Sequence, residues 1–168
     1  TDVRIAMIDP NPKVQGKGQK LLERAGIHVA VGELEDEARE LNEAFITYHR
    51  KKRPFVIAKW AMSLDGKIAT YSGDSKWISS QKSRTFVHRL RSQTDALVVG
   101  VETVIKDDPQ LTVRLPHFHG KQPFRIILDR TGRAPLHSML LKHNDNKTFI
   151  FKDDLPALMK FLYDKEIL

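Results

Sequence analysis

Short apolar runs that alternate with helical patterns constrain the fold of this chain more than any other feature of its sequence. Strand-like runs occupy residues 3–8, 27–31, 55–62, 96–99, 125–128 and 148–151. Helical patterns occupy residues 19–25, 35–50, 80–91, 101–106 and 156–163. The first strand, helix and second strand are spaced as in a parallel pair joined by a right-handed crossover. The sequence therefore predicts an α/β fold.

Glycine, serine and proline punctuate this pattern. Gly26 is expected to close the first helix in the left-handed conformation, and Ser79 or Ser80 is expected to cap the helix that follows. The helix over 35–50 begins with acidic residues and ends with basic ones, as the helix dipole favours. We place a domain boundary at Arg53-Pro54, directly after this helix. The expected domains are residues 1–53 and 54–168.

Composition narrows the class of protein. The 28 Lys and Arg against 21 Asp and Glu give a formal net charge of +7, which suits an anionic partner. The bases are dispersed, and their one tight run, 50–53, is more typical of a solvated helix end or linker, so we do not expect nucleic-acid binding. No cysteine is present, which excludes disulfides and thiolate metal ligands within this chain.

The chain shows no membrane or export signal. No apolar run approaches the roughly 18 residues that cross a membrane, and the first residues lead straight into a strand-like run. We therefore expect a cytoplasmic protein without a membrane partner. The first residue is Thr1 rather than methionine, which indicates a processed or truncated product.

An ordered series of motifs resembles one enzyme family. Residues 8–12 (IDPNP), Gly16, Gly18 and 25–27 (AGI) resemble the end of the deaminase domain of bifunctional riboflavin-biosynthesis deaminase/reductases. Residues 59–67 (KWAMSLDGK) and 72–78 (SGDSKWI) resemble the start of their reductase domain. The same order continues through Leu90-Arg91, Asp95-Ala96, Gly100, Thr103-Val104, 107–109 (DDP), 111–114 (LTVR) and Leu128-Asp129. The resemblance covers about residues 5 to 129.

The resemblance implies two successive activities in a parent chain. The first domain would be the end of a zinc-dependent, cytidine-deaminase-like domain that deaminates a phosphorylated pyrimidine. The second would be part of a dihydrofolate-reductase-like domain. That domain uses NADPH to reduce the ribosyl group of 5-amino-6-(5-phosphoribosylamino)uracil to ribityl. We also expect a homo-oligomer.

The chain departs from the family at both ends. Zinc deaminases need His-x-Glu and Pro-Cys-x-x-Cys motifs, and neither occurs here. We therefore expect no metal ligands in this chain, a zinc site upstream of Thr1, and no deaminase activity. The late acidic, Gly-rich segment of the family's reductase domain is also absent, so the sequence leaves open whether this segment alone is an active reductase.

Lys59 is the expected catalytic residue. It interrupts an apolar run, so its side chain should point into a cleft. The resemblance implies that it contacts the substrate there, and it could also supply a proton. A lysine on an edge strand that reaches into solvent is the alternative. The resemblance implies that Ala61, Trp77, Thr103 and Asp107 contact NADPH. Trp77 could instead be a core residue, and Asp107 could simply end a helix.

The resemblance also implies a set of substrate contacts: Ser75, Arg91, Leu111 and Arg114 in the reductase part, and Asp9 and Asn11 in the deaminase part. Guanidinium groups bind phosphate bidentately, which suits the two arginines, although either could be an ordinary surface residue. A plain turn explains Asp9 and Asn11 equally well. Two other functions stay open: a basic nucleotide or nucleic-acid module that uses 50–53 with Trp60 or Trp77, and a stand-alone reductase of a related pterin or pyrimidine.

Overall fold

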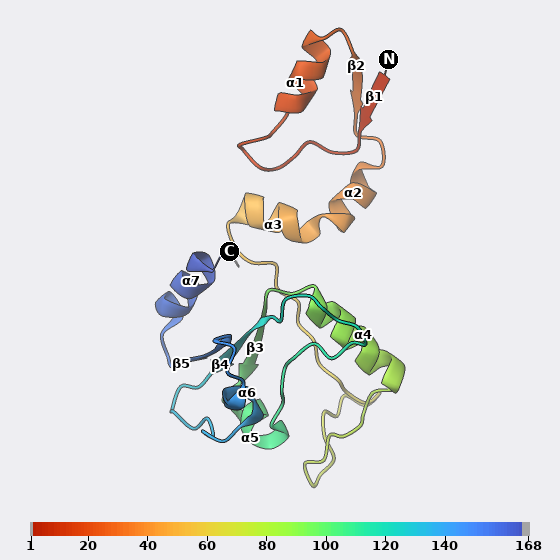
Figure 1. The fold of residues 1–168 in the computed structure, drawn as a ribbon. Coiled ribbons are helices and arrows are strands. Elements are labelled where there is room, and N and C mark those ends of the chain that lie inside the picture. The colour runs from red at the N-terminus through yellow and green to blue at the C-terminus, as the bar shows by residue number, and fades with distance from the viewer. Residues whose placement is uncertain (1, 166–168) are drawn as a thin grey trace. The chain divides into compact units, whose positions relative to one another are not determined.

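The computed structural model describes residues 2–165, which fall into two compact units. One unit runs up to Ala58 and the other starts at Lys59 (Figure 1). Both contain parallel strands joined through helices, so the predicted α/β class is confirmed. None of the helices in these residues combines the length and apolar content that a membrane span requires.

The first unit is built on a two-stranded parallel sheet. Strand β1 (Asp2–Ile5) pairs with β2 (His28–Val31) from Asp2 opposite His28 to Ile5 opposite Val31. Helix α1 (Lys17–Arg24) makes the crossover between them, as predicted. Gly26 ends the helix with φ +74°. Its N–H donates to the Glu23 carbonyl, and the next N–H, of Ile27, donates to the Leu22 carbonyl, which satisfies the free carbonyls of the last turn.

The single helix expected over 35–50 is two helices, so this prediction is wrong in detail. Helix α2 (Glu35–Leu41) and helix α3 (Glu43–Lys51) are separated by Asn42, whose φ of −107° and ψ of 19° leave the helical region. The Asn42 side-chain amide donates to the Ala38 carbonyl at 2.8 Å. Asparagine side chains bond to nearby backbone in this way and interrupt helices, which the apolar periodicity alone did not reveal.

The second unit is built on a three-stranded parallel sheet in the order β3-β4-β5. Its strands are β3 (Ala96–Gly100), β4 (Phe124–Leu128) and β5 (Thr148–Phe151), and its helices are α4 (Gln81–Ser92), α5 (Val101–Asp107), α6 (Met139–Lys142) and α7 (Leu155–Asp164). Central strand β4 supplies fully buried Ile126 and Ile127. Ile127 packs with Val101 and Val104 of α5 and Leu140 of α6, which forms the core.

The predicted strand over 55–62 is absent. Residues 54–62 are not strand in the structure, and no backbone hydrogen bond of theirs occurs within the described part of the chain. The apolar run has the composition of a strand, but a strand also needs a partner whose backbone completes the ladder. Without one, Val56 and Trp60 stay largely exposed, at 70% and 63%.

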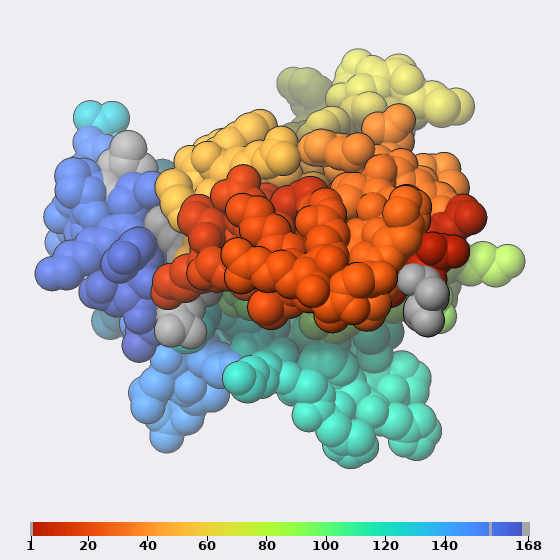
Figure 2. All heavy atoms as spheres, turned by 90° about the horizontal axis from the view of Figure 1, so that it is seen from above, coloured from red at the N-terminus to blue at the C-terminus, as the bar shows by residue number. Residues whose placement is uncertain are grey.

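The segment after residue 62 forms a projecting loop before α4. The loop contains two turns that are each closed by a backbone hydrogen bond. The Ser63 N–H donates to the Lys67 carbonyl, and the Thr70 N–H donates to the Asp74 carbonyl. Leu64 and Tyr71 at the two turns are fully exposed, and Figure 2 shows the yellow-coloured segment standing out from the surface. The loop ends at Ser80, whose hydroxyl accepts the Ser83 N–H and caps α4, as predicted.

Candidate active site

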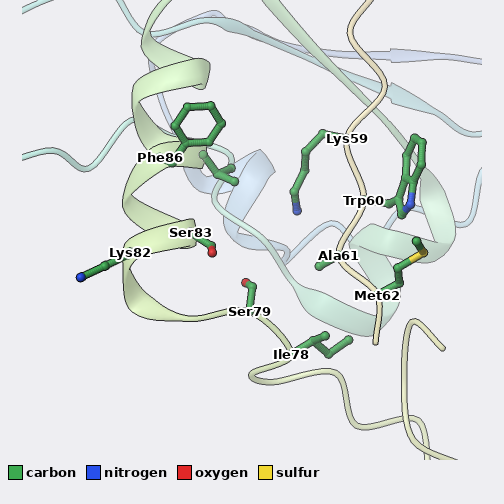
Figure 3. Close-up of a pocket in the computed structure, with 10 residues that line it drawn as sticks. Lys59, Trp60, Ala61, Met62, Ile78, Ser79, Lys82, Ser83 and Phe86 are labelled. Carbon is green, nitrogen blue, oxygen red and sulfur yellow. The ribbon is translucent and has the colours of Figure 1, made fainter. Parts of the chain in front are cut away.

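An open pocket of about 640 Å³ lies within the second unit, between its first residues and the start of α4. Residues 59–62 line one wall, and the other is lined by Ile78, Ser79, Lys82, Ser83, Phe86 and Val87 (Figure 3). This second wall is half apolar, and its polar members are Ser79, Ser83 and Lys82. A concave, partly apolar space with a few polar groups is the usual form of a small-molecule site.

The extended segment presents alternate side chains to the pocket. In Figure 3, Lys59 and Ala61 face α4, while Trp60 and Met62 point to the opposite side. This is the alternation of a β-strand, kept although the segment has no ladder partner. The Nζ of Lys59 extends into the pocket, and within the described residues it makes no hydrogen bond or ion pair. A cation with free donors therefore lies in a pocket that is lined by both apolar and polar side chains.

Ser75 and Trp77 lie in the loop before α4 and do not line this pocket. Ser75 is half-buried, and Trp77 is 71% exposed, so the core role considered for this tryptophan does not hold. The Arg84 guanidinium stacks on the Trp77 ring, 4.4 Å from a ring centroid. Arg84 is fixed in turn by hydrogen bonds to the Ser79 carbonyl and the Gln81 side chain. The loop therefore displays a flat aromatic surface that is braced from α4.

Thr103 and Asp107 lie one turn apart on α5, which directly follows β3. Thr103 is half-buried and Asp107 is exposed at the helix end. Ligands of parallel α/β sheets bind beyond the carboxyl ends of the strands, which is where α5 begins. The neighbouring Asp108 has a structural role instead, because its carboxylate accepts the Met139 N–H at 2.7 Å.

Arg91, Leu111 and Arg114 come together through α4 and the loop over 111–114. Arg91 donates to the Thr112 carbonyl at 2.7 Å, and Leu111 packs against the core with φ +49°. Burial lowers the pKa of Arg91, and the positive charge of Arg114 lowers it further. Neither arginine has a carboxylate partner within the described residues, and the Nε of Arg91 is buried without a hydrogen-bond partner. The pair therefore has unused capacity for an anion.

His88 belongs to the same cluster, although the sequence gave no reason to select it. Its Nδ1 accepts the Arg114 backbone N–H at 3.2 Å. Burial lowers the pKa of His88, and the charges of Arg91 and Arg114 add to this effect. The one signal available in the sequence was its position three residues before Arg91, which places both on one face of a helix.

Asp9 and Asn11, in the first unit, make local turn contacts. The Asn11 N–H donates to the Asp9 carboxylate at 2.8 Å, and the Lys13 N–H donates to the Asn11 side-chain oxygen at 3.0 Å. Such bonds are typical of aspartate and asparagine in turns. No group of three or more histidine, aspartate or glutamate side chains in residues 2–165 could hold a metal ion. The residues of this chain therefore do not fit the zinc site of a deaminase.

Comparison with known proteins agrees with the motif series. Residues 54–168 match the family described as RibD C-terminal domain. The chain is 51% identical over 148 residues to riboflavin biosynthesis protein RibD of Aquifex aeolicus, covering 88% of this chain and 41% of that protein. It is 43% identical over 162 residues to the protein of the same name from Actinobacillus pleuropneumoniae, covering 95% of this chain and 43% of that protein.

Solved structures give the same result. A diaminohydroxyphosphoribosylaminopyrimidine deaminase/5-amino-6-(5-phosphoribosylamino)uracil reductase from Thermotoga maritima matches with a TM-score of 0.84 and 39% identity, covering 98% of this chain and 51% of that one. RibD of Acinetobacter baumannii matches with a TM-score of 0.81 and 36% identity, covering 99% of this chain and 52% of that one. The chain thus spans about two fifths to one half of the relatives' lengths. The resemblance to riboflavin-biosynthesis enzymes is confirmed, and the chain belongs to the RibD C-terminal domain family.

Proposed function

We propose that this chain supplies part of the reductase site of a bifunctional riboflavin-biosynthesis enzyme. The reaction is the NADPH-dependent reduction of the ribosyl group of 5-amino-6-(5-phosphoribosylamino)uracil to ribityl. Family membership over residues 54–168 supports this proposal, as does the reductase activity in the name of the Thermotoga maritima relative. On this proposal, residues 1–53 are the end of a cytidine-deaminase-like domain, and residues 54–168 begin a dihydrofolate-reductase-like domain.

The observation that carries the proposal is the placement of Lys59 in the pocket. Its side chain extends into a pocket whose lining includes the apolar side chains of Ile78, Phe86 and Val87 and the hydroxyls of Ser79 and Ser83. NADPH supplies a hydride to the ribosyl carbon when it is bound. The bond between this carbon and the ring oxygen of the sugar breaks, and Lys59 holds the proton that this oxygen takes up. Ala61, on the same side of the segment, leaves room for close approach to the backbone.

The remaining contacts rest on the chemistry of the two arginines and, for the other residues, on the family resemblance. Arg91 and Arg114 take the phosphate of the substrate, because they form a cationic pair without a carboxylate partner in the described part of the chain. The Trp77 ring and the Thr103 and Asp107 side chains contact NADPH, and Ser75 and the Leu111 backbone contact the substrate. Asp9 and Asn11 contact the pyrimidine of the deaminase reaction, whose zinc is held by residues outside this chain. The enzyme acts as a homo-oligomer.

Replacing Lys59 tests this assignment. In a chain extended to the full length of its relatives, Lys59→Met should lower kcat about 10²- to 10⁴-fold, the usual contribution of a general acid. The change should leave KM for NADPH nearly unaltered, since no cofactor contact is removed. Lys160→Met, a change at an exposed lysine of α7, is the matched control and should keep full turnover. Full turnover by Lys59→Met would show that this lysine takes no part in the reaction.

A further inference from the structure

The loop over 111–114, which carries Arg114, is held at every residue. Leu111 packs against the core, and the Thr112 carbonyl accepts from Arg91. The Gln122 side chain binds both backbone groups of Val113, accepting from its N–H at 2.7 Å and donating to its carbonyl at 3.2 Å. The last contact is the Arg114 N–H, which donates to His88. Without His88, the backbone of Arg114 would lose the one hydrogen bond that the described residues give it.

The Arg114 side chain is exposed and is held only by long hydrogen bonds. Its guanidinium makes two long hydrogen bonds, at 3.3 Å to the Gln110 side chain and at 3.4 Å to the Thr112 hydroxyl, and the residue is exposed. Bonds of this length are weak and can be exchanged for an anion. The backbone of Arg114 therefore fixes the point from which the guanidinium reaches.

The His88 ring accepts at Nδ1 and is therefore neutral, with its proton on Nε2. A protonated ring would present an N–H to the Arg114 N–H and lose this bond. Burial and the charges of Arg91 and Arg114, the charged groups that face it, lower the pKa of His88 and favour the neutral form. The two arginines thus keep His88 in the state that holds the loop.

We propose that His88 is a positioning residue for phosphate recognition, which holds Arg114 through its backbone N–H so that its guanidinium and that of Arg91 meet the same phosphate group. This inference rests on the proposed function, because it assumes that the two arginines take the phosphate. His88 itself does not contact the phosphate in this proposal. An asparagine, whose Oδ1 occupies the same position along the side chain as the Nδ1 of histidine, should replace it.

Isothermal titration calorimetry of this chain with ribose 5-phosphate tests the proposal. His88→Leu should weaken binding about three- to tenfold, as expected for one neutral hydrogen bond, while His88→Asn should stay within about twofold of the unchanged chain. Arg114→Ala should weaken binding about ten- to a hundredfold. In the Arg114→Ala background, His88→Leu should have no further effect, because there is no guanidinium left to position.

The outcomes separate this inference from the function on which it rests. If Arg114→Ala weakens binding but His88→Leu does not, the positioning role is wrong and the phosphate site stands. Equal weakening by His88→Leu with and without Arg114 would also overturn it, since that is the result of general loss of structure. If the unchanged chain does not bind ribose 5-phosphate, or Arg114→Ala binds it equally well, the proposed phosphate site fails and this inference fails with it.

Discussion

At the scale of single residues, Arg125 is the least expected feature of the core. It lies in the central strand β4 with its side chain fully buried, and it is paired with the partly exposed Asp145 and hydrogen-bonded to the Thr148 hydroxyl. Burial would raise the pKa of Asp145, but the hydrogen bond and charge of Arg125 outweigh it and lower that pKa. The pairing could not be predicted, because a lone arginine in an apolar run is equally typical of an exposed edge position.

Removing the carboxylate should therefore cost more than removing the guanidinium. Asp145→Ala should lower the free energy of unfolding by about 2 to 3 kcal/mol, because a buried cation is left without its counterion while the 37% exposure of Asp145 moderates the loss. Arg125→Met should cost less, since it fills similar volume and leaves a carboxylate that water can reach. Urea unfolding of both variants measures the difference, and the reverse order would contradict this explanation.

Asp129 should make stability depend on pH in acid. The pKa of this buried carboxyl is lowered, and the largest cause is the hydrogen bond that it accepts from the Arg133 N–H. Burial alone would raise the pKa, but the N–H groups of Ala134, Gly132 and Thr131 lower it further. Its contribution to stability is complete above the ordinary value of 3.8 and is lost as pH falls through the lowered folded value. Asp129→Asn should therefore be less stable than the unchanged chain near neutral pH. The difference in free energy of unfolding between the two chains, measured by urea unfolding, should become smaller below pH 3.8.

Residue types indicated much of the candidate site, but not how its members are held. Lys59 was selected mostly from the family resemblance and also because it interrupts an apolar run, and the structure shows that it lines a pocket. The Arg84 contact to Trp77 and the His88 contact to Arg114 were not predicted. The second of these joins a helix to a loop 26 residues later, and such a distant contact leaves no local pattern in the sequence.

At the scale of elements, local signals were sufficient where an element satisfies its own backbone or has a partner nearby. Helix α4 and strands β3, β4 and β5 were predicted from a serine cap and from apolar runs, and all are present. The run over 55–62 failed because a strand depends on a partner that composition does not report. The short helix α6 was missed because its four residues are fewer than the periodicity needs to show.

The cap of α4 gives a prediction at this scale. Ser80→Ala removes the oxygen that accepts the Ser83 N–H at 3.2 Å, and it should lower the free energy of unfolding by about 1 kcal/mol. Ser92→Ala, in the last turn of the same helix, is the matched control and should change stability by less than about 0.5 kcal/mol. Thermal unfolding followed by circular dichroism measures both. Equal effects of the two changes would show that the cap contributes nothing.

At the scale of the whole molecule, the alternation of strands and helices predicted the fold class, and the order of the motifs predicted the family. Neither could give the sheet order β3-β4-β5 or the identity of its central strand. Sheet order depends on which buried faces pack together, and Ile127 with Val104 and Leu140 is a contact between distant parts of the chain. Most of the described contacts that form the site lie within the unit that begins at Lys59. The central claim of a reductase site therefore concerns this unit.

Titration of the chain with NADPH tests that claim most directly. We predict saturable binding that moderate salt does not abolish, and that Trp77→Ala weakens about tenfold through loss of aromatic contact. Tyr71→Ala, which removes a fully exposed aromatic ring from the same loop, should bind as the unchanged chain does. Absence of NADPH binding, together with binding of a single-stranded oligonucleotide that falls steeply with added salt, would contradict the claim and favour a basic nucleic-acid module instead.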